Sequence, residues 1–113
     1  MRIGIVGLGY VGLPLAVAFA EAGHDVVGYD VDDGRVELLG SGESDIEDVG
    51  SERLRALGER FTPTTDADEL PACDAVLICV PTPLASQREP DLTYVRSSAE
   101  TIADHLREGQ LIV

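Results

Sequence analysis

The feature that most constrains the fold is a glycine-rich segment directly after the first apolar run. Residues 3–6 lead without a break into Gly7, Gly9 and Gly12, which have the spacing G-x-G-x-x-G. This spacing alone is weak evidence, but here a helical pattern and a second apolar run follow it. Asp30 closes that second run, 18 residues after Gly12. The order of strand, glycines, helix, strand and acid predicts a βαβ unit that binds a dinucleotide.

Each of these residues has an expected physical role. Gly7 allows a tight turn, Gly9 lets a pyrophosphate approach the backbone, and Gly12 lets the helix pack close to the strand. The first turn of the helix offers unpaired N–H groups and the positive end of its dipole to the pyrophosphate. Asp30 can bind both ribose hydroxyls and would repel a 2′-phosphate, so the segment predicts NAD in preference to NADP. The alternative is a glycine-rich turn that binds nothing.

The rest of the chain alternates between strand and helix patterns. Strands are predicted at residues 2–6, 25–29, 61–65, 74–80 and 110–113, and helices at 11–22, 32–39, 52–57, 66–70 and 91–106. The fourth strand is nearly all apolar, as a parallel strand buried on both faces must be. We expect Gly40 to end the second helix and Ser51 to cap the third. Pro71 should end the turn at 66–70.

This alternation predicts an α/β fold, a Rossmann-type doubly wound parallel sheet with right-handed crossovers. The expected strand order is 3-2-1-4-5, with the ligand crevice between the first and fourth strands. The 113 residues are enough for one domain. The final apolar run, residues 111–113, has no closing turn or helix after it. We therefore expect the chain to be a fragment, truncated within its last strand.

The charge of the chain is strongly one-sided. The formal net charge is −13, and the eight basic residues are all arginine. Such a surface has no basic patch to displace counterions and so disfavours nucleic acids and anionic membranes, and we expect neither as a partner. Salt would screen the self-repulsion of such a surface, so we interpret it as an adaptation to a salt-rich cytoplasm, typical of a halophile. A GC-rich genome that encodes arginine in place of lysine is the alternative.

Neither a membrane span nor a secretory leader is recognisable, so we expect a cytoplasmic protein. Cys73 and Cys79 show no metal-binding spacing, and we expect reduced thiols and no metal site.

Three stretches carry a resemblance to a known family: residues 3–16 (IGIVGLGYVGLPLA), 79–83 (CVPTP) and 88–95 (REPDLTYV). On these stretches the chain resembles the NAD-binding domain of the UDP-glucose/GDP-mannose dehydrogenase family, and most of all the branch that oxidises UDP-N-acetylhexosamines. The run Gly-Tyr-Val-Gly-Leu-Pro is far more specific than the glycine spacing alone. The resemblance spans the whole chain, which would be only the first quarter to third of such an enzyme.

The resemblance implies roles for further residues. Tyr10 and Val11 would lie on the pyrophosphate side of the cofactor. Arg35 would flank the adenosine ribose that Asp30 binds. Thr82, just after the fourth strand, would touch the cofactor where the strand order reverses. Each assignment has an alternative: Tyr10 could be a surface aromatic with only its backbone N–H involved, Arg35 a solvated helix residue and Thr82 a hydroxyl in a turn.

Family enzymes oxidise a sugar alcohol twice, to the carboxylate, with two NAD⁺. The resemblance implies a cysteine nucleophile and a lysine that both lie beyond this chain, so no catalytic residue is expected here. This chain should bind NAD without catalysis, while the full-length enzyme would take a UDP-sugar and form a homodimer or larger assembly. The alternatives are a β-hydroxyacid or 6-phosphogluconate-type dehydrogenase, a stand-alone NAD-sensing module and, most weakly, a methyltransferase.

Overall fold

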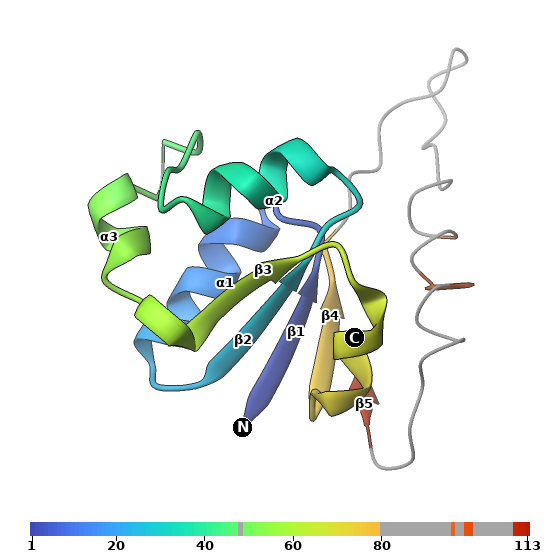
Figure 1. The fold of residues 1–113 in the computed structure, drawn as a ribbon. Helices are drawn as coiled ribbons and strands as arrows, with labels where there is room; N and C mark the ends of the chain where they lie inside the picture. The colour runs from blue at the N-terminus through green and yellow to red at the C-terminus, as the bar shows by residue number, and fades with distance from the viewer. Residues whose placement is uncertain (48, 80–95, 97–98, 101–109) are drawn as a thin grey trace.

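The computed structural model describes residues 1–47, 49–79, 96, 99–100 and 110–113. The strands in this part of the chain form one parallel sheet in the order β3-β2-β1-β4-β5 (Figure 1). They are β1 (Arg2–Val6), β2 (Asp25–Tyr29), β3 (Phe61–Thr64), β4 (Ala75–Ile78) and β5 (Leu111–Ile112). The chain order reverses between β1 and β4. This confirms the predicted Rossmann-type α/β sheet and its strand order.

Short helices cover the sheet and connect its strands. They are α1 (Gly12–Glu21), α2 (Asp33–Gly40), α3 (Ser51–Arg55) and the 3₁₀ turns η1 (Gly58–Arg60) and η2 (Ala67–Ala72). Helix α1 and turn η2 lie on opposite faces of the sheet (Figure 1). The core is divided accordingly, because alternate residues of a strand point to opposite faces. Ile5 packs in the α1 layer, while Val6 packs with Leu70 of η2.

The register brings the carboxyl ends of the central strands to one edge. Val6, at the end of β1, lies opposite Tyr29 of β2 and Ile78 of β4. The N–H of Gly7 donates to the Tyr29 carbonyl (2.8 Å) and the N–H of Cys79 donates to the Val6 carbonyl (2.7 Å). The glycine loop therefore begins at the edge where ligands bind in open α/β sheets.

The predicted end of α2 at Gly40 agrees with the structure, but the left-handed residue lies two positions later, and the predicted cap of α3 is wrong. Gly40 is the last residue of α2, and the left-handed residue is Gly42, with φ +85°. The N–H of Glu43 bonds to the Leu38 carbonyl and that of Gly42 to the Leu39 carbonyl, which is a Schellman ending. Ser51 is inside α3 rather than its cap.

The cap of α3 is Gly50, and no side chain caps the helix. The hydroxyl of Ser51 instead accepts a hydrogen bond from the N–H of Ser44 (3.1 Å). Pro71 also differs from the prediction, because it lies inside η2. A proline removes only one N–H donor from a short 3₁₀ turn, and the φ angle that its ring imposes is compatible with 3₁₀ geometry.

Of the predicted helix at 91–106, only residues 96, 99 and 100 are described, and these three are helical; Thr82 lies outside the described residues. In the described part of the chain, none of the helices combines the length and the apolar character that crossing a membrane requires.

Candidate cofactor site

The glycine loop joins β1 to α1 through a turn that leaves no room for side chains on its inner side. Gly7 has φ +96°, in the left-handed region that favours glycine. A Cβ atom on Gly12 would overlap the carbonyl oxygen of Gly7 and lie 2.8 Å from its carbonyl carbon. Helix α1 therefore starts directly against the end of β1, as predicted for this glycine.

The outer side of the same loop is open. A Cβ atom on Gly9 would have no neighbouring atom within 4 Å. Tyr10 and Val11 are 82% and 67% exposed. Val11 is the N-cap of α1, but no side chain caps this helix and no acid lies in its first turn. The N–H of Leu13 donates to the Gly9 carbonyl (3.1 Å), and no side chain caps the N–H groups before it, which can therefore face an anion.

Between the glycines, Leu8 points into the core and is fully buried. Its Cδ2 atom would lie 2.8 Å from a Cβ atom on Gly28 of β2, as would Cε1 of Phe61. The side chain of Leu8 therefore fits against β2 only because Gly28 has no side chain. Sequence reasoning missed both residues, although a glycine inside a strand indicates that another group approaches the backbone closely.

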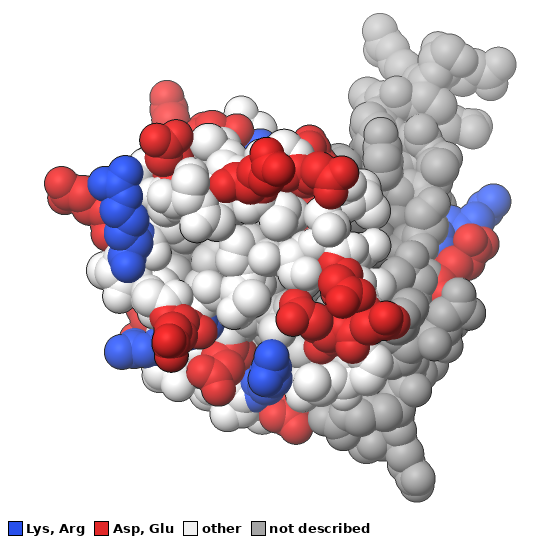
Figure 2. Space-filling view, in the orientation of Figure 1, with Lys and Arg blue, Asp and Glu red and all other residues white. Residues whose placement is uncertain are grey.

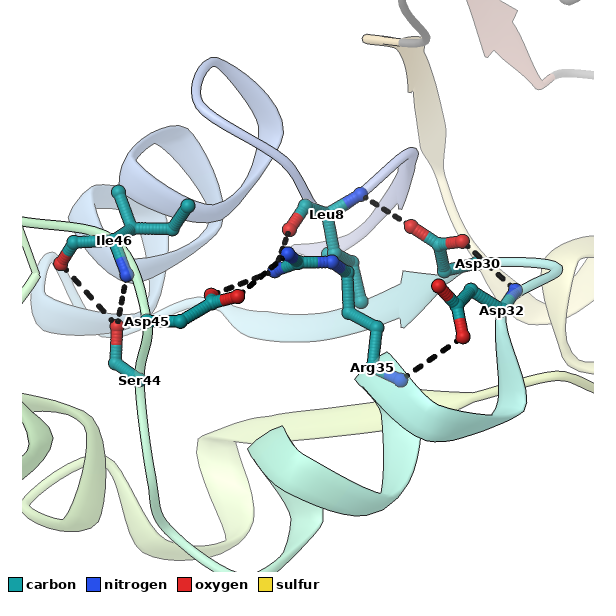
Figure 3. Close-up of polar contacts among 7 residues, drawn as sticks. All are labelled: Leu8, Asp30, Asp32, Arg35, Ser44, Asp45 and Ile46. Atoms are coloured by element: carbon teal, nitrogen blue, oxygen red, sulfur yellow. Dashed lines mark hydrogen bonds and ion pairs between the residues drawn. The ribbon is translucent and has the colours of Figure 1, made fainter.

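Asp30 holds the glycine loop from the end of β2 (Figure 3). Its Oδ2 accepts a hydrogen bond from the N–H of Leu8 (2.9 Å), and its Oδ1 accepts one from the N–H of Asp32 (3.0 Å). A carboxylate can accept about four hydrogen bonds. Asp30 is partly exposed and so keeps acceptor capacity for the hydroxyls of a ribose.

Arg35 reaches the same loop from the first turn of α2. Its Nη1 donates to the Leu8 carbonyl (3.1 Å), and its guanidinium forms a two-pronged ion pair with Asp45 (Nη1–Oδ1 3.0 Å, Nη2–Oδ2 2.8 Å). Leu8 is therefore held by Asp30 at its N–H and by Arg35 at its carbonyl (Figure 3). The structure brings together the two residues that the resemblance placed at the ribose.

Asp45 was missed by sequence reasoning. It lies in an acidic loop without periodicity, so nothing in the pattern singles it out from its neighbours. The sequence offers Asp32 or Asp33 as the cap of α2, and the structure selects Asp32, because its Oδ1 accepts from the N–H of Arg35 (3.2 Å).

The cysteines differ in their surroundings. Cys73 is fully buried, whereas Cys79 is half-buried and lies one residue beyond β4, not within the strand as predicted. Burial raises the pKa of the Cys79 thiol, which keeps it protonated and unreactive at neutral pH. Among the residues that the structure describes, no group of histidine, cysteine and acidic side chains could hold a metal ion.

A hollow of about 520 Å³ lies at the opposite edge of the sheet. Arg2, Asp25 and Arg60 are among its lining residues, at the amino ends of the strands. Because parallel sheets bind ligands at the carboxyl ends of their strands, the glycine loop is the better candidate site.

Comparison with known proteins identifies the domain. A family model described as UDP-glucose/GDP-mannose dehydrogenase family, NAD binding domain, matches residues 1–113. The chain is 36% identical over 117 residues to a UDP-N-acetyl-D-mannosamine dehydrogenase of Pyrococcus horikoshii, covering 100% of the chain and 28% of that protein. It is 38% identical over 108 residues to a UDP-glucose 6-dehydrogenase of Haloferax volcanii, covering 94% and 25%.

A solved structure has the same fold. The ternary complex of a GDP-mannose dehydrogenase from Pseudomonas aeruginosa matches with a TM-score of 0.89 and 35% identity, over 96% of the chain and 26% of that protein. The chain thus spans about a quarter of the length of the relatives that it matches.

Proposed function

Since the chain belongs to the UDP-glucose/GDP-mannose dehydrogenase family as its NAD-binding domain, we propose that the whole protein is a nucleotide-sugar 6-dehydrogenase. It would oxidise a UDP-sugar, either a UDP-N-acetylhexosamine or UDP-glucose, to the uronate with two NAD⁺, as a step of polysaccharide biosynthesis. Relatives named for both kinds of sugar match the chain at similar identity, so the sugar stays open between them. Membership of this family disfavours a β-hydroxyacid dehydrogenase or a methyltransferase.

The observation that carries the proposal is the open turn at Gly9 beside the carboxylate of Asp30. Gly9 and the N–H groups at Tyr10 and Val11 would receive the pyrophosphate, since nothing lies within 4 Å of the Gly9 Cβ position. Asp30 would bind the adenosine ribose with Arg35 beside it. Gly7 and Gly12 belong to the same proposed cofactor site and shape the turn that would hold the cofactor.

Two further assignments complete the proposed site. Thr82 would contact the cofactor at the carboxyl end of the fourth strand. NAD⁺, when bound, supplies the acceptor for the hydride of the sugar alcohol, while the residues of this chain bind and orient it. We assign no catalytic residue to the chain, and propose that the nucleophile and the sugar pocket lie in the rest of the protein.

The acidic surface supports a salt-rich cytoplasm as the working environment. Acidic side chains outnumber basic ones on the face shown in Figure 2, in the part of the chain that the structure describes. Such a surface repels nucleic acid and anionic lipid. The partners that we propose are a UDP-sugar and a second copy of the full-length enzyme.

Calorimetric titration of the chain in about 1 M KCl tests cofactor binding, since exposed charges are screened there beyond about 3 Å. We expect NAD⁺ to bind, NADP⁺ to bind at least about tenfold more weakly, and S-adenosylmethionine not to bind. Asp30→Asn keeps an acceptor for the Leu8 N–H but removes the charge, so the preference for NAD⁺ should shrink. If NADP⁺ binds the native chain as tightly as NAD⁺, the assignment of Asp30 is wrong.

The activity of the whole protein needs a separate test. The full-length enzyme, incubated with UDP-glucose, UDP-N-acetylglucosamine or UDP-N-acetylmannosamine, should form two NADH per sugar with at least one of them. If NADH forms with none of the three, the proposed substrate class is wrong even if the domain binds NAD⁺.

A further inference from the structure

The guanidinium of Arg35, which lies next to the proposed ribose site, forms an ion pair with Asp45. Its two terminal nitrogens, Nη1 and Nη2, bind the carboxylate oxygens at 3.0 and 2.8 Å. The side chain of Arg35 is 22% exposed, and that of Asp45 is 48% exposed. The pair is therefore at the surface of the site and not in the core.

An arginine at this place has a known chemical capacity. In dinucleotide-binding folds, an arginine close to the end of the second strand accommodates the 2′-phosphate of NADP. Arg35 follows Asp30 by five residues, and both contact Leu8, one at its carbonyl and the other at its N–H. A phosphate on the ribose at Asp30 would thus come near this guanidinium.

We propose that Asp45 is a specificity-determining residue, which holds the Arg35 guanidinium and so prevents it from receiving a ribose 2′-phosphate. This rests on the proposed function as an NAD-binding domain. Asp45 acts in two ways: it occupies two donors of the guanidinium in a fixed fork, and its charge offsets the positive charge that would attract a phosphate. Discrimination against NADP would then come from Asp30 and Asp45 together.

The loop around Asp45 has its own anchors, so the ion pair is not what holds it in place. Ile46 and Val49 are 5% and 1% exposed, and both belong to the core. The hydroxyl of Ser44 accepts from the N–H of Ile46 (3.2 Å; Figure 3). The N–H of Ser44 donates to the hydroxyl of Ser51 (3.1 Å). Asp45→Asn should therefore leave the loop where it is and change mainly the charge.

The test is the ratio of the dissociation constants of NADP⁺ and NAD⁺ in four chains: native, Asp45→Asn, Asp30→Asn and the double variant. Titrations at one fixed, low salt concentration keep the pair unscreened. In the Asp30→Asn background, we expect Asp45→Asn to tighten NADP⁺ at least about tenfold relative to NAD⁺. Adding Arg35→Gln to the double variant should abolish this gain, because the gain acts through the guanidinium.

Glu21→Gln is the matched control. It removes the same charge from a second two-pronged arginine–carboxylate pair among the described residues, which Glu21 forms with Arg53 at the far end of α1, and should leave the ratio unchanged. If Asp45→Asn weakens or strengthens both cofactors equally, Asp45 only shapes the loop and the inference is overturned. If NAD⁺ does not bind the native folded chain at all, the proposed function fails first, and this inference fails with it.

Discussion

Two glycines of the glycine-rich turn, Gly9 and Gly12, have completely different surroundings. At Gly12, an added Cβ atom would overlap the backbone of Gly7, whereas at Gly9 it would have no neighbour within 4 Å. Gly12 is required by the packing of α1 against β1. At Gly9, no neighbouring atom that the structure describes requires a glycine. We propose that a glycine stands there to let a ligand approach, so that one motif would combine a folding requirement with a binding requirement.

Gly12→Ala gives the largest expected effect. Because the clash is with backbone atoms, α1 must move away from β1, and the stability of the chain should fall by about 3 kcal/mol or more. Denaturant unfolding followed by circular dichroism measures this loss. A variant as stable as the native chain would mean that the helix does not start against Gly7.

Gly9→Ala should separate binding from folding. The position has room and its φ is outside the left-handed region, so the thermal midpoint should stay close to that of the native chain. The affinity for NAD⁺ should nevertheless fall at least about tenfold, since the methyl group occupies the space of the pyrophosphate. Calorimetry measures the thermal midpoint and the affinity for NAD⁺ of Gly9→Ala and Gly12→Ala. If Gly9→Ala binds NAD⁺ as tightly as the native chain, Gly9 has no role in binding.

Salt should raise the thermal stability of the whole chain without changing the difference between Gly9 and Gly12. Raising KCl from about 0.1 M to about 1 M shortens the screening length from about 10 Å to about 3 Å. With a net charge of −13, the thermal midpoints of the native chain and of Gly9→Ala should rise by similar amounts. Scanning calorimetry over a salt series measures this. Midpoints that stay level or fall would contradict a halophilic origin.

Glu21→Gln should have the smallest effect. Glu21 and Arg53 are both well exposed, and their hydrogen bond lowers the pKa of the carboxyl below its ordinary value. A lowered pKa stabilises the fold above the ordinary pKa, and this stabilisation is lost as the pH falls through the lowered value. The thermal midpoints of native and variant chains should thus differ slightly at neutral pH in low salt. They should converge at acid pH and in molar salt, where the pair is protonated or screened.

The sheet and the turn could be predicted because their signals are local. The apolar run before Gly7 and the nearly continuous one ending near Ile78 predict parallel strands, and the topology rules then determine their order. The roles of Gly7 and Gly12 in shaping the turn follow from their spacing together with the strand before them and the helix after them. The assignments of cofactor contacts to Gly9, Tyr10 and Val11 stay predictions.

Other parts of the site depend on contacts between residues distant in sequence. Leu8 requires a glycine in β2, at Gly28, and no pattern links the two positions. Asp45 meets Arg35 only because a loop of ten residues folds back over α2. The ending geometry of α2 and the extent of η2 could not be predicted for a related reason. The Schellman ending at Gly42 and the 3₁₀ geometry around Pro71 depend on how the chain continues.

The burial of Leu8 ties the cofactor to the survival of the fold. This residue is part of the hydrophobic core, and its peptide groups also form the inner wall of the turn that would hold the pyrophosphate. Unfolding must dismantle both at once, so the unfolded chain has no site left for the dinucleotide. By mass action, a ligand at about 100 times its dissociation constant then adds about 2.7 kcal/mol of stability. The lifetime of this domain against proteases would therefore rise and fall with the NAD⁺ pool of the cell.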